Sequence, residues 1–285
     1  MHFERIIPDQ HYGEFYSSFA EHIRRYAFAS RSVGTAGTVL DLGSGCGYGS
    51  AYLAEVPGRV IIGLDRSHEA TKYASMHYQG NRLSYLVGDA SVLPVKTESI
   101  DAVIALEIVE HIKNIESTML EIKRVLKRQG IFIASTPNRL VTGTEKTPTN
   151  PYHIREYTPN EFEALLTPLF KNVIVYGQAL TPATLAGREN MQRIWHNLSL
   201  IPVLYHEIQS LHCRLVLDER ITGLSLLRRL KRWCFGQSRG AIEETPPDIN
   251  QRFRHPPFSV SSMQDWDISP YQLKEAPVIV AVCTA

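Results

Sequence analysis

The sequence lacks the features that would direct it to nucleic acid, to a membrane or to an oxidising compartment. Its 30 basic and 29 acidic residues leave a formal net charge of +1, so no global charge points to a nucleic-acid partner. No run approaches the roughly 18 uncharged apolar residues of a membrane span. The opening MHFERIIPDQ has acidic and polar residues where a signal peptide has an apolar run. The four cysteines are scattered without a CxxC pair, which favours thiols in a reducing compartment. We therefore expect a cytoplasmic location.

What the sequence does contain is an alternation of short apolar runs and helix-like segments. Its 285 residues suffice for one large α/β domain with an elaboration, or for two small domains. Short β-branched or apolar runs are typical of strands buried on both faces of a parallel sheet. Seven are expected, at residues 38–42, 59–65, 83–89, 100–107, 130–136, 172–177 and 277–283. The pattern predicts an α/β fold, a Rossmann-like doubly wound seven-stranded sheet with ligands at the carboxyl ends of its strands.

The helical segments carry their own signals. The apolar stripe of Ile115, Met119, Ile122 and Leu126 predicts a helix that covers the sheet. After a long loop at 137–157, the segment TPNEFEALL begins with a capping box, so a second helix is expected there.

The last expected strand begins only at residue 277, far along the chain from its predecessor. We therefore expect a core domain of residues 1–178 plus 277–285. Residues 179–276 are expected to form a helical lid or substrate-binding insertion before the last strand.

The stretch VLDLGSGCGYGS, residues 39–50, predicts a strand, a glycine turn and a helix start. Glycine lets the backbone come close to a ligand, and the helix start offers unpaired N–H groups. A dinucleotide pyrophosphate would bind those groups, but the carboxylate of Asp41 would repel it. The same carboxylate suits a ligand that carries an ammonium or sulfonium group. The turn therefore favours a cationic ligand over the NAD of an oxidoreductase on the same topology.

Acidic residues also end the three strands that follow. Asp65 comes 22 residues after Gly43, where an acid can accept hydrogen bonds from both ribose hydroxyls. Asp89 is placed to meet an adenine edge, and Glu107 faces the same crevice. One such acid alone is often only a cap or a turn residue. Their recurrence at successive strand ends predicts a nucleoside site.

These segments together resemble a known family. VLDLGSGCGYG, GLD, GDA and IDAVIALEIVEHI resemble the motifs of class I S-adenosylmethionine-dependent methyltransferases. EIVEHI is similar to the branch with a Glu-His pair after the fourth strand, which includes quinone, sugar and natural-product O-methyltransferases. ERIIPD, EHIRRYAFA and STPN…NPYHIREYTPNEF look like methyltransferases often associated with bacterial glycan assembly. The resemblance covers about residues 3–178 and the last strand, whereas residues 179–276 resemble no family that we can name.

The resemblance implies S-adenosyl-L-methionine as the cofactor and S-adenosyl-L-homocysteine as its product. It implies cofactor-binding positions on the turn and at the strand ends: Gly43, Gly45 and Gly47 by the methionine moiety, Asp41 by its amino group, Asp65 on the ribose, Asp89 and Ala90 at the adenine, and Glu107 near the sulfonium. Arg25 either approaches the methionine carboxylate or lies on the surface.

Two histidines lie where an acceptor would bind. A methyl group on a sulfonium is already activated, so its transfer mainly needs in-line alignment, but a hydroxyl acceptor also needs a base. His111 follows the fourth strand and His153 lies on the long loop; each is either a base or a structural residue. Arg155 and Tyr157 are candidates to bind a phosphate or a sugar of the acceptor. No HxxxH pattern or carboxylate cluster accompanies them, so no metal is expected.

The expected function is O-methylation of a hydroxyl on a sugar, a glycan or a secondary metabolite. The alternatives are N-methylation of an amino sugar and a catalytically inert cofactor-binding scaffold or sensor. Six basic residues and no acid lie between Arg220 and Ile242, around LLRRLKRWCF. This segment is either a solvated helix face or a surface for peripheral membrane contact or an anionic acceptor. The sequence leaves the oligomeric state open.

Overall fold

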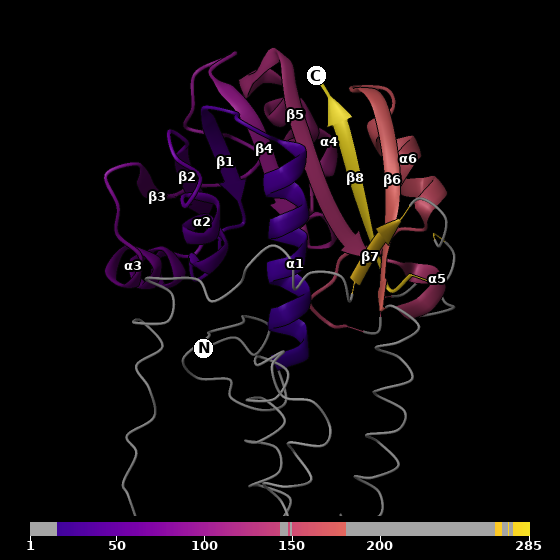
Figure 1. The fold of residues 1–285 in the computed structure, drawn as a ribbon. Coiled ribbons are helices and arrows are strands. Elements are labelled where there is room, and N and C mark those ends of the chain that lie inside the picture. The colour runs from indigo at the N-terminus through magenta and orange to yellow at the C-terminus, as the bar shows by residue number, and fades with distance from the viewer. Residues whose placement is uncertain (1–15, 143–147, 149, 181–265, 270–272, 274–275) are drawn as a thin grey trace, which may run out of the picture. The chain divides into compact units, whose positions relative to one another are not determined.

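The computed structural model describes residues 16–142, 148, 150–180, 266–269, 273 and 276–285, and Figure 1 draws the elements that they form. Residues 19–181 and 266–285 belong to one compact unit. Most of the expected insertion of residues 179–276, with the whole basic segment around LLRRLKRWCF, lies outside the described residues. Its helical character and its function as a lid stay predictions.

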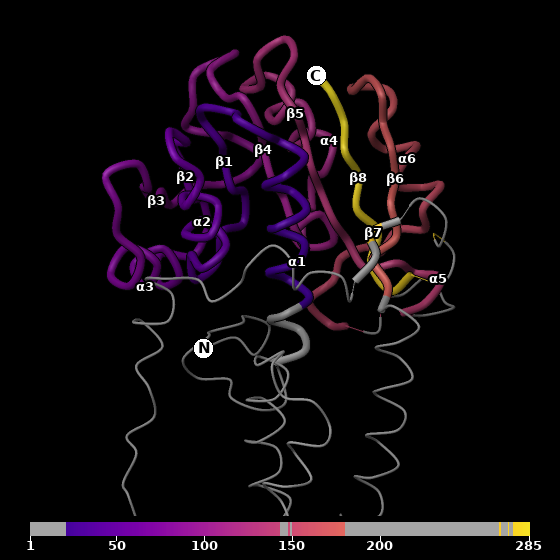
Figure 2. The backbone as a smooth tube through the Cα atoms, in the orientation of Figure 1, coloured from indigo at the N-terminus to yellow at the C-terminus, as the bar shows by residue number. Residues whose placement is uncertain are grey.

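One mixed sheet organises the described chain. Its strands are β1 (Thr38–Leu42), β2 (Val60–Asp65), β3 (Leu83–Val87), β4 (Ile100–Leu106), β5 (Leu126–Pro137), β6 (Lys171–Leu180), β7 (Trp266–Ser269) and β8 (Val278–Thr284). They lie in the order β3-β2-β1-β4-β5-β8-β6-β7. Pairing is parallel from β3 to β5, and β8 runs antiparallel between β5 and β6. The predicted α/β fold is confirmed, and the backbone trace can be followed in Figure 2.

Helices cover both faces of the sheet, which makes it doubly wound. They are α1 (Tyr16–Ser32), α2 (Tyr48–Leu53), α3 (His68–His77), α4 (Ile115–Val125), α5 (Arg139–Thr142) and α6 (Pro159–Leu166), with a short 3-10 turn at Val109–His111. Strand β4 shows why both faces need cover, because its side chains alternate between two apolar clusters. Val103 and Ala105 pack with α4 and α6, whereas Ala102 and Ile104 pack with α1 and α2.

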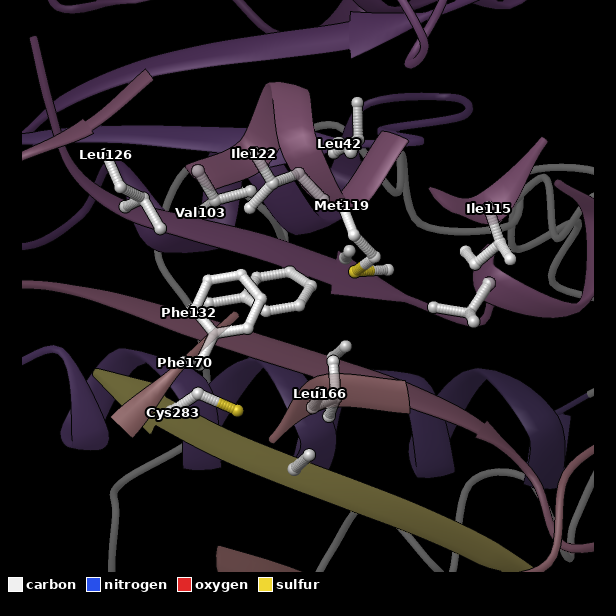
Figure 3. Packing of buried hydrophobic residues seen from close by; sticks show 14 of the residues in the cluster. Leu42, Val103, Ile115, Met119, Ile122, Leu126, Phe132, Leu166, Phe170 and Cys283 are labelled. Atoms are coloured by element: carbon white, nitrogen blue, oxygen red, sulfur yellow. The ribbon is translucent and has the colours of Figure 1, made fainter. Parts of the chain in front are cut away.

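The α4 face contains the larger apolar cluster, part of which Figure 3 shows. Ile115, Met119 and Ile122 of the predicted helical stripe all point into it and are at most 6% exposed. Leu126, the fourth residue of that stripe, is also buried there, but it begins β5 instead of ending the helix. The stripe therefore identified the buried face correctly and placed the end of the helix one residue late.

The two helix starts that matter for the site are capped by side chains. The side chain of Asn114 accepts a hydrogen bond from the Ser117 N–H at the start of α4. Thr158 and Glu161 form the predicted capping box at the start of α6, with Pro159 in its first turn. The cap of α6 comes directly after the loop that joins β5 to α6, and a parallel bridge between Asn138 and Tyr157 holds the two ends of that loop together.

One strand was not predicted. β7 lies within the expected insertion and pairs antiparallel with β6, from Gly177 opposite Ser269 to Leu180 opposite Trp266. It extends the expected seven-stranded core by a short edge strand. The sequence WDIS has only four residues and no flanking periodicity, so no sequence pattern marked it.

Candidate functional site

The glycine turn follows β1 and lies against the end of β2. The N–H groups of Gly43 and Ser44 donate to the carbonyl of Leu64, at 2.7 and 3.1 Å. The turn needs left-handed backbone at three alternate glycines: φ is +78° at Gly43, +53° at Gly45 and +88° at Gly47. Non-glycine residues adopt such angles only at a cost, so the sequence GSGCG dictates this local shape.

The three glycines differ in what surrounds them. A Cβ at Gly43 would come within 2.5 Å of Ile108 Cδ1, and one at Gly47 within 2.5 Å of Ala74 Cβ. A Cβ at Gly45 would meet nothing within 4 Å. Gly43 and Gly47 therefore allow the protein to pack on itself, whereas Gly45 presents bare backbone to open space. Gly45 is the position where a ligand can lie directly against the turn.

Asp65 at the end of β2 is tied to this same turn. Its Oδ2 accepts the N–H of Gly45 at 2.9 Å, and its Oδ1 accepts the N–H of Ser67 at 2.8 Å. The side chain is thus held rigidly beside the open face of the turn. An ionised carboxylate has about four lone-pair positions, enough to accept ligand hydroxyls in addition to backbone groups. The ribose contact that the sequence predicts for Asp65 stays a prediction.

Asp41 lies behind the turn and is fully buried. Its carboxylate accepts hydrogen bonds from the Ser50 hydroxyl at 2.5 Å and from the Tyr26 hydroxyl at 3.1 Å. Burial raises the pKa of Asp41 from 3.8 to about 6, against the effect of these two bonds. The structure thus gives Asp41 two protein partners that sequence reasoning missed, and its contact with a cofactor amino group stays a prediction.

Asp89 and Ala90 follow the end of β3 at the edge of the sheet. Asp89 is exposed, and its Oδ1 accepts both the N–H and the hydroxyl of Ser91, which lowers its pKa. Ala90 is half-buried and packs against the larger apolar cluster. Their contact with an adenine edge stays a prediction.

Glu107 at the end of β4 has a strained backbone. Its φ of +53° is left-handed, which is uncommon for a residue with a side chain and often marks a functional position. Three bonds to Ser135 of β5 hold it there: its N–H donates to the Ser135 carbonyl and to the Ser135 hydroxyl oxygen, and its Oε1 accepts the Ser135 hydroxyl at 2.7 Å. Glu107 therefore projects from the carboxyl end of β4, as the sequence predicts.

Arg25 reaches this strand end from α1. It is 2% exposed; its Nη1 donates to Gln178 Oε1 at 2.6 Å, and its Nη2 lies 3.9 Å from Glu107 Oε2. Its buried Nε has no hydrogen-bond partner among the described residues. Of the two alternatives from the sequence, the surface position is wrong. Arg25 is a buried cation over the ends of the central strands.

Glu110 is the acidic member of the Glu-His pair that the sequence shows beside His111, although it was not among the predicted site residues. It follows β4 in the 3-10 turn, is 1% exposed, and its Oε2 has no hydrogen-bond partner within the described part of the chain. Burial and the nearby charge of Glu107 raise its pKa well above 4.5. Its own carbonyl accepts the N–H of Ile154 at 2.7 Å, which docks the long loop onto this turn.

The docked loop brings the two predicted histidines together, although 41 residues separate them in the chain. Their rings pack edge to face, with centroids 4.9 Å apart and planes at 76°. His111 Nδ1 lies 3.0 Å from the Tyr152 carbonyl oxygen. His153 Nδ1 lies 2.7 Å from Glu156 Oε1, and its Nε2 lies 3.0 Å from the side-chain nitrogen of Asn150. The fold has thus built a histidine pair beside the end of β4.

This pair bears on the question of a metal. Glu110, His111 and His153 offer ligand atoms that all lie within 4.8 Å of one another. An imidazole ligand must present a ring-nitrogen lone pair to the ion. Both ring nitrogens of His153 already contact protein groups, Glu156 and Asn150, so an ion would have to displace one of them. The expectation that the site uses no metal stays a prediction.

The two candidate acceptor-binding residues differ in exposure. The Arg155 side chain is 59% exposed and lies over the Tyr157 ring, with 4.8 Å from Cζ to the ring centroid. Tyr157 is 2% exposed and packs on Phe162 of α6. Arg155 is thus presented to solvent, whereas Tyr157 supports it from the core. Their contact with an acceptor stays a prediction.

Comparison with known proteins agrees with this geometry. Residues 40–134, which run from β1 to β5, match the family model described as a methyltransferase domain. A probable S-adenosylmethionine-dependent methyltransferase of Mycolicibacterium smegmatis is 36% identical over 129 residues, 45% of this chain and 49% of that protein. A protein of the same description from Mycobacterium tuberculosis is 33% identical over 165 residues, 57% of this chain and 58% of that protein. Residues 40–134 thus form a methyltransferase domain, and there the chain is similar to class I S-adenosylmethionine-dependent methyltransferases.

The similarity to known methyltransferases covers only part of each relative. The chain spans about half the length of the curated relatives that it matches, 49% and 58%. A solved structure, phosphoethanolamine N-methyltransferase 2 of Haemonchus contortus in complex with S-adenosyl-L-methionine, shares the fold. Its TM-score is 0.51 at 15% identity, over 92% of this chain and 52% of that one. Among the described residues, no helix combines the length and the apolar character needed to cross a membrane.

S-adenosylmethionine is the cofactor that the methyltransferase domain and its curated relatives indicate. The described residues fit it in two respects. Gly45 leaves a space beside the backbone that a Cβ would fill, and Asp65 holds a carboxylate beside that space. When bound, the cofactor supplies a methyl group that its sulfonium has already activated. The remaining requirements, an acceptor site and a route for the acceptor proton, fall to the protein.

Proposed function

We propose that the chain transfers a methyl group from S-adenosylmethionine to a hydroxyl of a sugar, a glycan or a secondary metabolite. The histidine pair beside the end of β4 carries this proposal, because a hydroxyl needs a proton acceptor as it is methylated. The acceptor oxygen attacks the methyl carbon while the carbon–sulfur bond breaks. The hydroxyl proton passes to a ring nitrogen of His111 or His153, and the neutral thioether S-adenosylhomocysteine leaves.

Surrounding residues support this chemistry. Glu107, in its strained conformation, lies at the end of β4. Its carboxylate there would favour the positive charge of a sulfonium. The side chain of His111 is 26% exposed, so an acceptor can reach its ring. Arg155, supported on Tyr157, offers a guanidinium to an anionic group of the acceptor, such as a phosphate.

The proposal is tested with purified protein, S-adenosylmethionine and a panel of nucleotide sugars, glycans and hydroxylated small molecules. Mass spectrometry reports the gain of one methyl group, and fragmentation locates it on oxygen or on nitrogen. The variants His111→Gln and His153→Gln are compared with His68→Gln, which changes an exposed histidine on α3. We expect the loss of the base to lower kcat by about 10²-fold or more, and the α3 variant to keep it.

Each other outcome contradicts a stated part of the proposal. A methyl group on nitrogen would replace the O-methyltransferase assignment by the N-methyltransferase one. Cofactor binding without methyl transfer to any member of the panel would favour a binding scaffold. Full activity in both histidine variants would show that the pair is not the base.

A further inference from the structure

The hydrogen bonds around the histidine pair have only one consistent direction. A backbone N–H can only donate, so Asn150 must present its side-chain oxygen to the N–H of Tyr152, at 3.0 Å. The Asn150 side-chain nitrogen then faces His153 Nε2 and must donate to it, at 3.0 Å. Nε2 of His153 therefore carries no proton. A neutral ring has its hydrogen on Nδ1, which donates to Glu156 Oε1 at 2.7 Å.

The same argument fixes the tautomer of His111. The carbonyl of Tyr152 can only accept, so the Nδ1 that lies 3.0 Å from it must carry the hydrogen. In the neutral ring the lone pair then lies on Nε2, the nitrogen that is 3.9 Å from Glu110 Oε1. Both rings thus have Nδ1 protonated, but the Nε2 lone pair of His153 is already used by Asn150.

Asn150 makes three hydrogen bonds to groups that flank the Tyr152 carbonyl, the acceptor that orients His111. The Asn150 side-chain oxygen accepts the Tyr152 N–H, and the Asn150 carbonyl accepts the His153 N–H at 3.1 Å. The peptide that contains the Tyr152 carbonyl therefore donates its own N–H to Asn150 while it accepts from His111. The Asn150 amide nitrogen also holds the His153 ring, which packs against the ring of His111.

Glu156 anchors the far end of this arrangement. Its side chain is 2% exposed; one oxygen accepts from His153 Nδ1 and the other from the hydroxyl of Thr142. A buried carboxylate that accepts from an imidazole N–H fixes both the tautomer and the orientation of that ring. The His153 side chain is only 10% exposed, against 26% for His111. His153 is thus the more buried, supporting imidazole, and His111 is the one more exposed to solvent.

We propose that Glu156 and Asn150 are positioning residues for His111, the proton-accepting histidine of the pair. This inference rests on the proposed function and makes it more specific. His153 connects Glu156 and Asn150 to the ring of His111, and it does not itself take the acceptor proton. Among the described residues, Glu110 on its own turn and His153 of the docked loop are titratable groups near His111, and Glu156 contacts His153.

The test is a long-range ¹H–¹⁵N correlation spectrum of the histidine rings in the full chain at neutral pH, which reports tautomers without any acceptor. We expect both rings with the hydrogen on Nδ1. Asn150→Ala removes the contacts of the Asn150 side chain, so we expect His111 to populate both tautomers instead of one. Asn150→Asp keeps an acceptor for the Tyr152 N–H but cannot donate, so it should change the ring of His153 and leave His111 on Nδ1. Should Asn150→Ala fail to fold, the changes that Asn150→Asp causes in the ring of His153 and in kcat decide instead.

Glu156→Gln keeps the shape and an acceptor for His153 but removes the charge. We expect it to keep both tautomers and to move the midpoint of the pH–rate profile to lower pH, because the negative charge behind the histidine pair is lost. Glu156→Asp, which restores the charge, should recover part of that shift. Glu163→Gln, at an exposed glutamate on α6, should leave the midpoint unchanged.

Activity measurements then distinguish a role in positioning His111 from a role in folding alone. With an acceptor from the methylation panel, Glu156→Gln and Asn150→Asp should lower kcat about tenfold or more with little change in KM. A hydrogen on His111 Nε2 in the unaltered protein, or an unchanged spectrum and pH profile in these variants, would overturn the inference. Failure of methyl transfer with every acceptor would overturn the proposed function while leaving the tautomer result as it stands.

Discussion

The hydroxyl of Tyr26, on α1, donates to Oδ1 of Asp41 at 3.1 Å, and the Ser50 hydroxyl on α2 donates to Oδ2 of the same carboxylate. Asp41 therefore joins two helices to the end of β1 beneath the glycine turn. Its buried position explains why its pKa is raised to about 6.

This raised pKa makes one part of the stability depend on pH in a defined direction. The folded protein holds the Asp41 proton more tightly than the unfolded chain, so the stabilisation is complete below about pH 4 and is lost as the pH rises through 6. Asp41→Asn cannot titrate. We expect its free energy of unfolding, relative to the unaltered protein, to improve by about 2 kcal/mol between about pH 4 and pH 7. Urea denaturation at a series of pH values measures this difference.

Asp101 provides the matched contrast. Although burial opposes the effect, hydrogen bonds from Lys127 and from the Thr38 N–H lower its pKa below 3.8. Its stabilisation is present at neutral pH and lost as the pH falls, so Asp101→Asn should show the opposite trend. Parallel pH dependence in both variants would contradict the assignment at Asp41.

The second prediction concerns Gly45 and its natural control, Gly34. Both have left-handed backbone, with φ of +53° and +56°, and a Cβ at either would meet nothing within 4 Å. Alanine at either position should therefore destabilise the fold by a similar amount, about 1 kcal/mol. Only Gly45 lies in the turn beside Asp65. Calorimetry should show that Gly45→Ala loses affinity for S-adenosylmethionine by tenfold or more, whereas Gly34→Ala binds as the unaltered protein does.

Equal affinities of these two variants would mean that the open space at Gly45 is not the cofactor space. Unequal losses of stability in the absence of cofactor would mean that the two sites are not matched, and the affinities would then need correction for folding. Comparing the two variants thus tests the cofactor site at Gly45 without requiring that the acceptor be known.

The third prediction concerns metal removal. Nδ1 and Nε2 of His153 are both engaged by protein groups, so an ion at Glu110, His111 and His153 would have to break an existing hydrogen bond. We expect dialysis against EDTA to leave the methyl-transfer rate unchanged, as measured by S-adenosylhomocysteine release. A loss that Zn²⁺ or Mn²⁺ restores would instead make these three residues metal ligands.

The local parts of this site could be predicted from the sequence, and the long-range parts could not. The glycine turn and the acids at the ends of β2 and β4 follow from residues that are neighbours in the chain, where periodicity and glycine spacing are direct signals. The partners of Asp41 come from two different helices. Neither the Tyr26 contact nor the burial that raises the pKa of Asp41 leaves a mark on the sequence.

The histidine pair shows the same limit. His111 and His153 were each identifiable by their place after a strand and on a long loop, but their contact depends on how that loop docks. The docking bond from Ile154 N–H to the Glu110 carbonyl uses backbone atoms, which have no residue signature. For this reason Asn150 and Glu156 were missed, although each has a direct contact with His153.

The fourth prediction concerns Arg25, a cation that α1 buries over the ends of the central strands. Its Nη2 lies 3.9 Å from Glu107, and its positive charge opposes the rise in the pKa of Glu110 that burial causes. Arg25→Met would leave two carboxyl groups together without that charge. Removing one partner of a buried ion pair typically costs 3–5 kcal/mol, and because Glu107 is 16% exposed we expect about 2–3 kcal/mol.

Chemical denaturation tests this expectation against Arg128→Met, which removes an exposed arginine near the start of β5. Arg25→Lys keeps the charge but cannot reproduce the planar fork that reaches Gln178 and Glu107 together, so it should recover only part of the stability. If Arg25→Met and Arg128→Met unfold at the same denaturant concentration, the buried charge contributes nothing. If Arg25→Lys is no better than Arg25→Met, the fork geometry and not the charge holds α1 over the site.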